Sequence, residues 1–283
     1  MSNDSSLESS ESTLPESMML KQVALWCADE ALMPQAQMLA TELELVLLSE
    51  ADPDDDKAWS TLLILSQQGL ALQQTGRKRP GPVMADFVSG AVAHRRMFGG
   101  GKGQLIAKAC GLKSGILPSI ADVTAGLGRD GFVLATLGCR VSLVERSGVV
   151  HALLRDALAR ACSAEELLPI LSRIDLHHAD GRQWLADCAD EQRPDVVYVD
   201  PMFPHTDKSA QVKKEMLLFR DIIGADDDAT ELLAAALETA RCRVVVKRPR
   251  KAPVIKGRAP SHQMPGKSCR YDIYALRKMD AGN

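Results

Sequence analysis

The sequence of 283 residues contains no run of about 18 consecutive apolar residues, the length with which a helix crosses a membrane. Its N-terminal stretch is rich in Ser and Glu and has no apolar segment typical of a secretory signal. The seven cysteines are scattered, and no two of them form a C-x-x-C pair. This pattern argues against a zinc site and against a disulfide framework. We therefore expect a cytoplasmic protein that binds neither a metal nor a membrane.

Basic residues are nearly absent from the first 60 residues, where only Lys21 and Lys57 oppose thirteen acidic residues. The balance reverses from Arg241 to the C-terminus, where twelve Lys and Arg residues oppose Asp272 and Asp280. A near-neutral protein with such basic stretches can bind a polyanion on one face. The alternative is that these charges only form a solvated surface, and charge alone does not decide between the two.

Composition divides the chain into four predicted segments. They are an acidic, Ser-rich disordered tail (1–17), a small α+β N-terminal domain (18–76), a basic Gly-rich connector with helices (77–118) and a larger α/β domain (119–283). The N-terminal domain is predicted to hold a strand over 23–27, a helix over 35–48 and a hairpin joining 62–65 to 70–72.

The connector contains four glycines within residues 99–103, which excludes a regular helix or strand there. Arg95, Arg96 and Lys102 surround this loop. Backbone N–H groups and positive charge in such a loop suit a phosphate, although a flexible hinge explains the glycines equally well.

Strand and helix patterns alternate from residue 119 onward, which predicts a mostly parallel sheet covered on both faces. The predicted strands are 120–124, 140–144, 174–178, 196–199, 243–246 and 271–276. The predicted helices are 129–137, 149–161, 183–188 and 229–240.

A glycine-rich turn follows the first of these strands and opens a helix. Gly126, Gly128 and Gly131 satisfy the spacing G-x-G-x-x-G, which permits a tight turn and a close backbone approach to a ligand. Glu145 ends the next strand, where a carboxylate can accept both hydroxyl groups of a ribose. The pattern indicates an adenosine-containing cofactor, either a dinucleotide or S-adenosylmethionine.

Two features favour S-adenosylmethionine. Asp122 lies in the strand just before the turn, where a carboxylate suits a cationic amino-acid group better than a pyrophosphate. The second feature is an Asp200 loop that a dehydrogenase does not need. The pair Asp180 and Gly181, at the end of the third strand, lies where an adenine edge would fall, or else it caps the following helix.

The Asp200 loop follows a short β-branched and aromatic run, residues 196–199, which predicts a buried strand. Pro201 cannot continue a central strand, so the strand ends at Asp200. An Asp at the carboxyl end of a strand, followed by Phe203 in a loop stiffened by prolines, suits a flat polar group. Read by itself, the stretch is equally compatible with an ordinary turn.

Residues 200–204, Asp-Pro-Met-Phe-Pro, resemble the D/N-P-P-Y/F loop of methyltransferases that modify exocyclic amines of bases. The wider set of motifs resembles the RsmJ family of bacterial 16S rRNA (guanine-N2) methyltransferases over roughly residues 86–276. These motifs are residues 86–103, 124–130, 145–146, 200–205, 212–216 and 245–249.

The resemblance implies a Rossmann-like class I SAM-dependent methyltransferase sheet over 119–283, with S-adenosyl-L-methionine as cofactor. The implied reaction transfers a methyl group to N2 of a guanosine near the 3′ end of 16S rRNA, either naked or within the small ribosomal subunit. The family's cofactor contacts fall on Arg129, Asp130, Glu145, Arg146, Asp180, Gly181 and Asp200. The sequence departs from the family pattern at Asp180-Gly181 and from the usual second proline at Met202.

Asp200, Pro201 and Phe203 are the predicted catalytic residues, with Asp200 accepting an N–H of the amine and Phe203 stacking on the base. His205 could relay a proton, although a histidine after a turn more often has no such role. The predicted RNA contacts are Arg95, Arg96, Lys102, Lys213, Lys214, Lys247 and Arg248. The alternatives are an NAD-dependent Rossmann oxidoreductase and a non-catalytic RNA-binding or ribosome assembly module.

Overall fold

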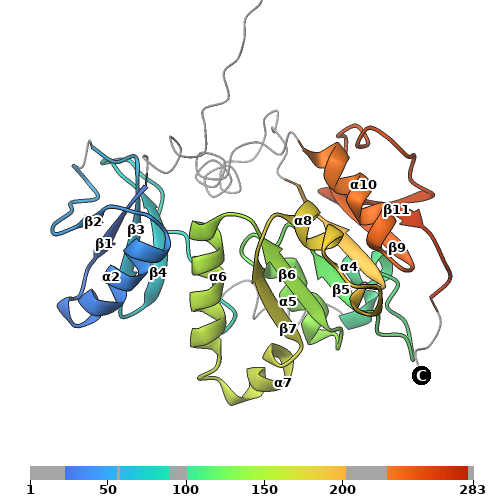
Figure 1. Cartoon of the computed structure of the whole chain (residues 1–283), viewed down its shortest axis with the longest axis horizontal. Coiled ribbons are helices and arrows are strands. Elements are labelled where there is room, and N and C mark those ends of the chain that lie inside the picture. The colour runs from blue at the N-terminus through green and yellow to red at the C-terminus, as the bar shows by residue number, and fades with distance from the viewer. Residues whose placement is uncertain (1–22, 56–57, 90–100, 202–227, 280–283) are drawn as a thin grey trace, which may run out of the picture.

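The computed structural model describes residues 23–55, 58–89, 101–201 and 228–279, which form two sheets (Figure 1). The N-terminal sheet has the strand order β2-β1-β3-β4, and only the β3–β4 pair is antiparallel. Its strands are β1 (Val23–Cys27), β2 (Leu47–Leu48), β3 (Thr61–Ser66) and β4 (Gly69–Gln74). The 3-10 turn η2 (Glu30–Leu32) and helix α2 (Met33–Glu42) follow β1.

The predicted strand and hairpin of this lobe are confirmed, but its helix is shorter than expected. The helix ends at Glu42, and Glu44 adopts a positive φ of 54°, which an α-helix does not accommodate. The chain therefore turns, and Leu47–Leu48 pair with β1 as a strand. The helical spacing of apolar residues over 35–48 was misleading because a short, half-buried strand also places leucines at those positions.

The larger sheet has the order β10-β11-β9-β8-β5-β6-β7, with β5 to β9 parallel and β10 and β11 antiparallel to their neighbours. Its strands are β5 (Ile120–Asp122), β6 (Val141–Glu145), β7 (Ile174–His178), β8 (Val196–Val199), β9 (Arg243–Pro249), β10 (His262–Pro265) and β11 (Cys269–Ala275). All six predicted strands are confirmed within a few residues. The edge strand β10 was not predicted, because His-Gln-Met-Pro carries no strand pattern.

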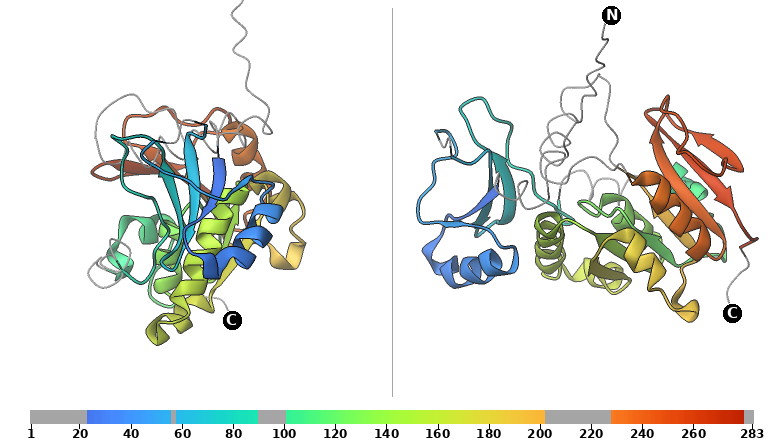
Figure 2. Two further views of the ribbon diagram at one scale, coloured as in Figure 1. Left: turned by 90° about the vertical axis from the view of Figure 1, so that its left-hand side faces the viewer. Right: turned by 45° about the horizontal axis from the view of Figure 1, so that its top comes forward.

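Helices cover both faces of this sheet (Figure 2). One face packs on α4 (Leu105–Ala109), α5 (Arg129–Thr136), α6 (Gly148–Ala161) and α7 (Leu168–Leu171), and the other on α8 (Gly181–Ala186) and α10 (Ala229–Thr239). The remaining 3-10 turns are η3 (Gly101–Gly103), η4 (Glu165–Leu167) and η5 (Asp190–Gln192). Within β8, Tyr198 points to the α5 face and Val197 to the α10 face, as the two-residue period of a strand requires. None of the helices in the described part of the chain is long and apolar enough to span a bilayer.

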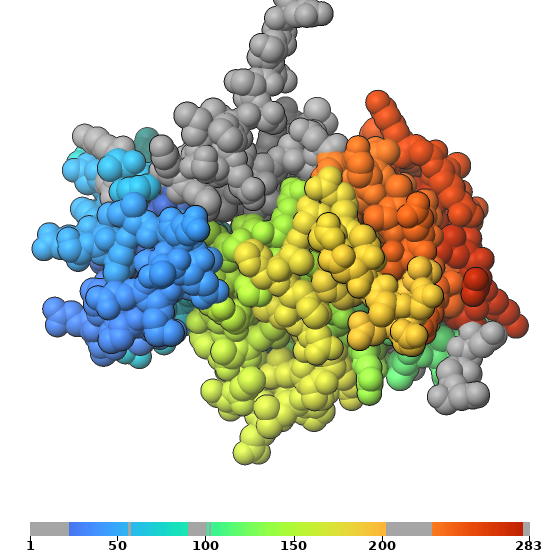
Figure 3. Space-filling view, in the orientation of Figure 1, coloured from blue at the N-terminus to red at the C-terminus, as the bar shows by residue number. Residues whose placement is uncertain are grey.

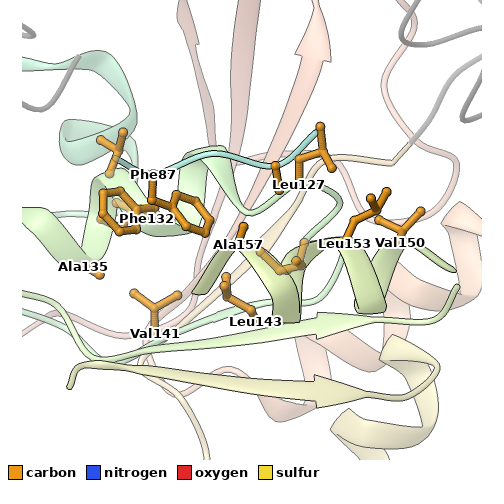
Figure 4. Packing of buried hydrophobic residues seen from close by; sticks show 14 of the residues in the cluster. Phe87, Leu127, Phe132, Ala135, Val141, Leu143, Val150, Leu153 and Ala157 are labelled. Carbon is orange, nitrogen blue, oxygen red and sulfur yellow. The ribbon is translucent and has the colours of Figure 1, made fainter. Parts of the chain in front are cut away.

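The hydrophobic core under α5 and α6 is continuous with the core of the N-terminal lobe. Phe87 comes from the segment that links the two sheets, and its ring stacks on Phe132 of α5 at a centroid distance of 4.4 Å (Figure 4). The N-terminal lobe lies against α6 (Figures 1 and 3). The Leu70 N–H of β4 donates to Asp156 Oδ2 of α6 at 3.1 Å. Apolar contacts thus connect the segments that the sequence predicts to be separate. The predicted division of the chain at residues 76 and 118 therefore stays a prediction.

Candidate active site

Four neighbouring strands each carry a carboxylate at their end or within two residues after it, at the same edge of the large sheet. In the spatial order β7, β6, β5 and β8, these residues are Asp180, Glu145, Asp122 and Asp200. The strand order reverses between β5 and β8, since β6 and β7 lie on one side and β9 on the other. Open α/β sheets bind ligands at such a switch point, outside the carboxyl ends of the strands.

The glycine-rich turn lies directly above this edge. Gly126 and Gly128 adopt φ values of +53° and +69°, in the left-handed region that favours glycine. A Cβ on Gly126 would meet no atom of the described residues within 4 Å, so they leave open space beside this residue. The Gly126 N–H donates to Glu145 Oε2 at 2.9 Å, which ties the turn to the end of β6.

Gly128 is required for a different reason, and its replacement tests the packing under the turn. A Cβ there would lie 2.7 Å from Leu154 Cδ1 and 3.1 Å from Phe87 Cζ. We expect Gly128→Ala to destabilise the fold by about 2–4 kcal/mol, from the positive φ and from overpacking together. Urea unfolding measures this cost.

Gly115→Ala is the matched control, because Gly115 has φ +73° and, in the part of the chain that the structure describes, no atom lies within 4 Å of the added Cβ. Gly115→Ala should therefore lose only the stability that the positive φ costs, about 1–2 kcal/mol. Equal losses in the two variants would mean that the contacts with Leu154 and Phe87 do not matter.

Glu145 is 5% exposed, and its carboxylate accepts two backbone N–H groups. Gly126 donates to Oε2 at 2.9 Å and Ser147 to Oε1 at 2.8 Å. A carboxylate oxygen has two lone pairs, so hydroxyl donors from a ribose can share these oxygens. The position and the chemistry of Glu145 therefore fit an adenosine group.

Asp122 is buried beneath the start of α5 and accepts the Thr124 N–H at 3.3 Å. Burial, and after it the carboxylate of Asp130, raises the pKa of Asp122 well above its ordinary value. A cationic group near this edge would favour the ionised form. The contact of Asp122 with the amino-acid end of S-adenosylmethionine stays a prediction.

Among the acidic residues that hydrogen bonds connect beside the glycine-rich turn, Asp200 is the most exposed. Its backbone N–H donates to Thr124 Oγ1 at 2.7 Å, which fixes the end of β8 against the end of β5. Its Oδ2 accepts from Lys247 Nζ at 2.7 Å, and the same ammonium donates to Asp130 Oδ2 at 2.8 Å. Tyr198 Oη donates to that Asp130 oxygen at 2.7 Å.

Asp180 caps helix α8, the alternative that the sequence left open: it accepts the Arg182 N–H at 2.9 Å. It also pairs with the Arg182 guanidinium, whose hydrogen bonds lower the pKa of Asp180. Gly181 is needed for packing, since a Cβ would lie 2.8 Å from the Val123 carbonyl oxygen. The adenine contact of this pair stays a prediction.

The other predicted cofactor residues also lie at this edge. Arg129 is exposed at the start of α5. Arg146 follows β6 and donates to Asp228 Oδ2 at 3.2 Å, and Arg182 reaches the same oxygen at 3.2 Å. These contacts join β6, α8 and the start of α10.

Two of the predicted RNA contacts occupy other positions than expected. Lys247 pairs with Asp130 and Asp200 and lies 27% exposed beside the candidate site. Arg248 does not lie on the surface: it is 4% exposed, donates to the Pro253 carbonyl, and has a pKa lowered by burial and by Arg270. Consecutive strand residues point to opposite faces, and the face of Arg248 is covered. Its predicted RNA contact has no support in this geometry.

Several predicted residues lie outside the described part of the chain. They are Arg95, Arg96, Phe203, His205, Lys213 and Lys214. Lys102 belongs to η3, and Pro201 is buried directly after Asp200. The roles of these residues stay predictions.

Sequence reasoning missed Tyr198 and Thr124. Tyr198 lies two residues before Asp200 on the same strand face, so its hydroxyl group comes close to the same network. Thr124 lies two residues after Asp122, and this spacing is a signal for a side chain at the same sheet edge.

The family model described as "Putative SAM-dependent methyltransferase" matches residues 46–276. The chain is 55% identical to the ribosomal RNA small subunit methyltransferase J of Cellvibrio japonicus, over 87% of this chain and 94% of that protein. It is 50% identical to the protein of that name from Marinobacter nauticus, over 96% and 99% of the two chains. The solved structure of a SAM-dependent methyltransferase from Neisseria gonorrhoeae superposes with a TM-score of 0.68 at 35% identity, covering 91% of this chain and 97% of that one.

These relatives confirm the predicted fold class, because the chain matches nearly the whole length of a solved methyltransferase and not only its sheet. They also select methyl transfer over the oxidoreductase and the non-catalytic alternatives. Identity of half or more over nearly the full length, with the glycine turn, Glu145 and Asp200 at one sheet edge, means that the chain belongs to the family of ribosomal RNA small subunit methyltransferases J and is a SAM-dependent methyltransferase.

Proposed function

We propose that this enzyme methylates the exocyclic N2 of a guanosine in 16S rRNA, either in the free RNA or in the small ribosomal subunit. The observation that carries the proposal is the position of Asp200, a carboxylate 38% exposed at the switch point beside the glycine turn. The names of the relatives support the RNA as substrate. A reaction on ribosomal RNA takes place in the cytoplasm of a bacterium.

Glu145, Asp122 and the Gly126 turn would hold S-adenosylmethionine. When bound, this cofactor would supply an electrophilic methyl group for the N2 lone pair, with its thioether as leaving group, and N2 would give up its extra proton to water. Asp200 accepts one N–H of the amine, orients the nitrogen and stabilises the positive charge that develops on it. No strong base is needed, because alkylation makes the nitrogen acidic.

The loop after β9 supports an RNA-binding surface next to Asp200. Arg270 is 7% exposed and donates to the carbonyls of Pro249, Arg250 and Ala252, which holds the loop in shape. Its own charge is balanced by Asp272 at 2.8 Å. The loop and the hairpin that follows it carry the exposed bases Arg250, Lys251, Lys256, Arg258 and Lys267. Exposed positive charge on a loop that hydrogen bonds hold in shape suits the phosphates that flank an extruded base.

The reaction is tested by tritium transfer from S-adenosylmethionine to small-subunit RNA from a strain lacking the gene. We expect about one methyl group per RNA, recovered as N2-methylguanosine, and calorimetric binding of S-adenosylhomocysteine but not of NAD. Transfer to another atom of the RNA, or binding of NAD alone, would contradict the proposal.

RNA affinity should fall steeply with salt, because phosphate contacts release counterions. Each contact with single-stranded RNA contributes about 0.7 to the slope of log K against log salt concentration. The double variant Lys251→Ala, Arg258→Ala should therefore reduce the slope by roughly 1.4. Fluorescence anisotropy with a labelled RNA hairpin measures the slope.

Arg193→Ala is the matched control for this measurement. Arg193 is also exposed, but it precedes β8 and lies at the opposite edge of the sheet. It should leave the slope unchanged. An equal reduction in the control would assign the effect to net charge and not to the loop after β9.

A further inference from the structure

Lys247 is the centre of a charged cluster that joins three elements of the candidate site. Its ammonium donates to Asp130 Oδ2 on α5 and to Asp200 Oδ2 after β8, at 2.8 and 2.7 Å. Tyr198 donates to the same oxygen of Asp130. Exposure rises along the cluster, from 13% at the Asp130 side chain to 27% at Lys247 and 38% at Asp200. The cluster therefore runs from the protein interior outward to the residue that faces the substrate.

The backbone explains why these side chains meet. Strands β8 and β9 pair in parallel up to Val199 and Val246, and the next residues along the two strands are Asp200 and Lys247. Both point to the α5 face, where the first turn of α5 presents Asp130. The strand register therefore places Lys247 directly beside Asp200, so the lysine side chain does not have to extend across the surface to reach this carboxylate.

We propose that Lys247 is a positioning residue for the methyl-transfer reaction, which holds the Asp200 carboxylate in place and in its ionised form for the guanine amine. This inference rests on the proposed function. A carboxylate can accept about four hydrogen bonds, so an ammonium on Oδ2 leaves it able to accept an N–H from the substrate. Asp200 thus acts as a fixed hydrogen-bond acceptor, and not as a base that takes up the proton.

The charges around Lys247 support this role. Burial opposes its positive charge, but Asp200 and Asp130 outweigh burial and raise the pKa of Lys247 above its ordinary value. Among the described residues, other ionisable groups that interact with Asp130 or Asp200 include Asp122, Tyr198 and Cys110, and burial raises the pKa of all three. Lys247 therefore stays protonated across the working pH range and is the positive charge that balances the two carboxylates.

The test replaces Lys247 by Met, which keeps the length of the side chain and removes its charge. With RNA and cofactor saturating, kcat should fall by about 10–100-fold, as expected for a misplaced catalytic group, while KM for RNA changes less than about threefold. The acid limb of the pH–rate profile should move upward by roughly one pH unit or more, because a nearby cation favours the charged form of a carboxylate. Lys247→Arg retains the charge, so it should leave the acid limb in place and recover part of kcat.

A second readout does not depend on turnover. Carbon-13 NMR of the cofactor-free protein follows the carboxyl signal of Asp200, which Asp200→Asn identifies by its loss. Its titration midpoint should be higher in Lys247→Met than in the wild type. If Lys247→Met does not fold, Lys247→Gln provides the same two measurements, since a neutral amide can still donate to a carboxylate.

Lys278→Met is the matched control, because Lys278 is an exposed lysine that follows β11 at the opposite edge of the sheet. It should leave KM for RNA, kcat and the acid limb unchanged. The inference is overturned if Lys247→Met retains the wild-type kcat, acid limb and Asp200 titration, or if Lys278→Met changes them equally. A wild-type protein that binds S-adenosylhomocysteine and transfers no methyl group to RNA would instead contradict the proposed function.

Discussion

Asp200→Ala should reduce methyl transfer to 16S rRNA by a factor of about 100–1000 or more, the cost of removing one preorganised group that stabilises transition-state charge. The substitution removes the carboxylate that orients the amine and leaves the backbone intact, since it is the Asp200 N–H that donates to Thr124. Binding of S-adenosylhomocysteine should change only a few-fold. Single-turnover tritium transfer and calorimetry measure the two quantities separately.

Asp200→Asn refines this result, because it preserves the shape of the side chain and removes its charge. It should be impaired less than Asp200→Ala, since the amide oxygen still accepts a hydrogen bond. Asp187→Ala is the control: Asp187 is an exposed carboxylate that follows α8, at the end of that helix remote from Asp180. Normal turnover in Asp200→Ala would contradict the mechanism, and an equal loss in Asp187→Ala would indicate a general effect of charge.

Glu145→Ala should weaken S-adenosylhomocysteine binding by about 100-fold or more, the equivalent of losing roughly 3 kcal/mol of charged hydrogen bonds. The loss has two parts. The ribose loses its acceptor, and the Gly126 N–H loses the partner that holds the turn in its bound shape. Calorimetric titration gives the affinity directly.

The same substitution should also destabilise the fold by about 1–3 kcal/mol, because the N–H groups of Gly126 and Ser147 lose a buried acceptor. Glu42→Gln is the matched control: Glu42 pairs with Arg155 between α2 and α6, with 45% of its side chain exposed. It should cost less than about 1 kcal/mol and leave cofactor affinity unchanged. Retained affinity in Glu145→Ala would exclude Glu145 from the cofactor site.

Regular elements with a strong local pattern were predictable. The spacing of apolar residues and the position of Pro201 predicted the buried strand β8. The spacing also predicted the alternation of strands and helices after residue 119, and both predictions are confirmed. The shorter elements were not. Strand β2 pairs with β1, which lies far away in the sequence, and β10 pairs with β11, which carries the stronger strand pattern. A strand that forms because of such pairing leaves little signal in its own residues.

The candidate site shows the same division. Asp122, Glu145, Asp180 and Asp200 could be found by their positions at the ends of strands, because the carboxyl ends of parallel strands share one edge. The order of the strands could not be found in this way, and it is the order that places β5 beside β8 and so Asp122 and Thr124 beside Asp200.

The sequence by itself determined the fold class, the glycine turn and the acids that follow the strands, because these features are local and periodic. Only the tertiary structure decided what Lys247 and Arg248 do. Both belong to one basic stretch and were predicted to contact RNA, yet one balances Asp130 and Asp200 and the other is buried against Pro253. The sequence shows only that each of these residues is cationic. The register of β8 and β9 and the layer that covers each face decide which anion that cation meets.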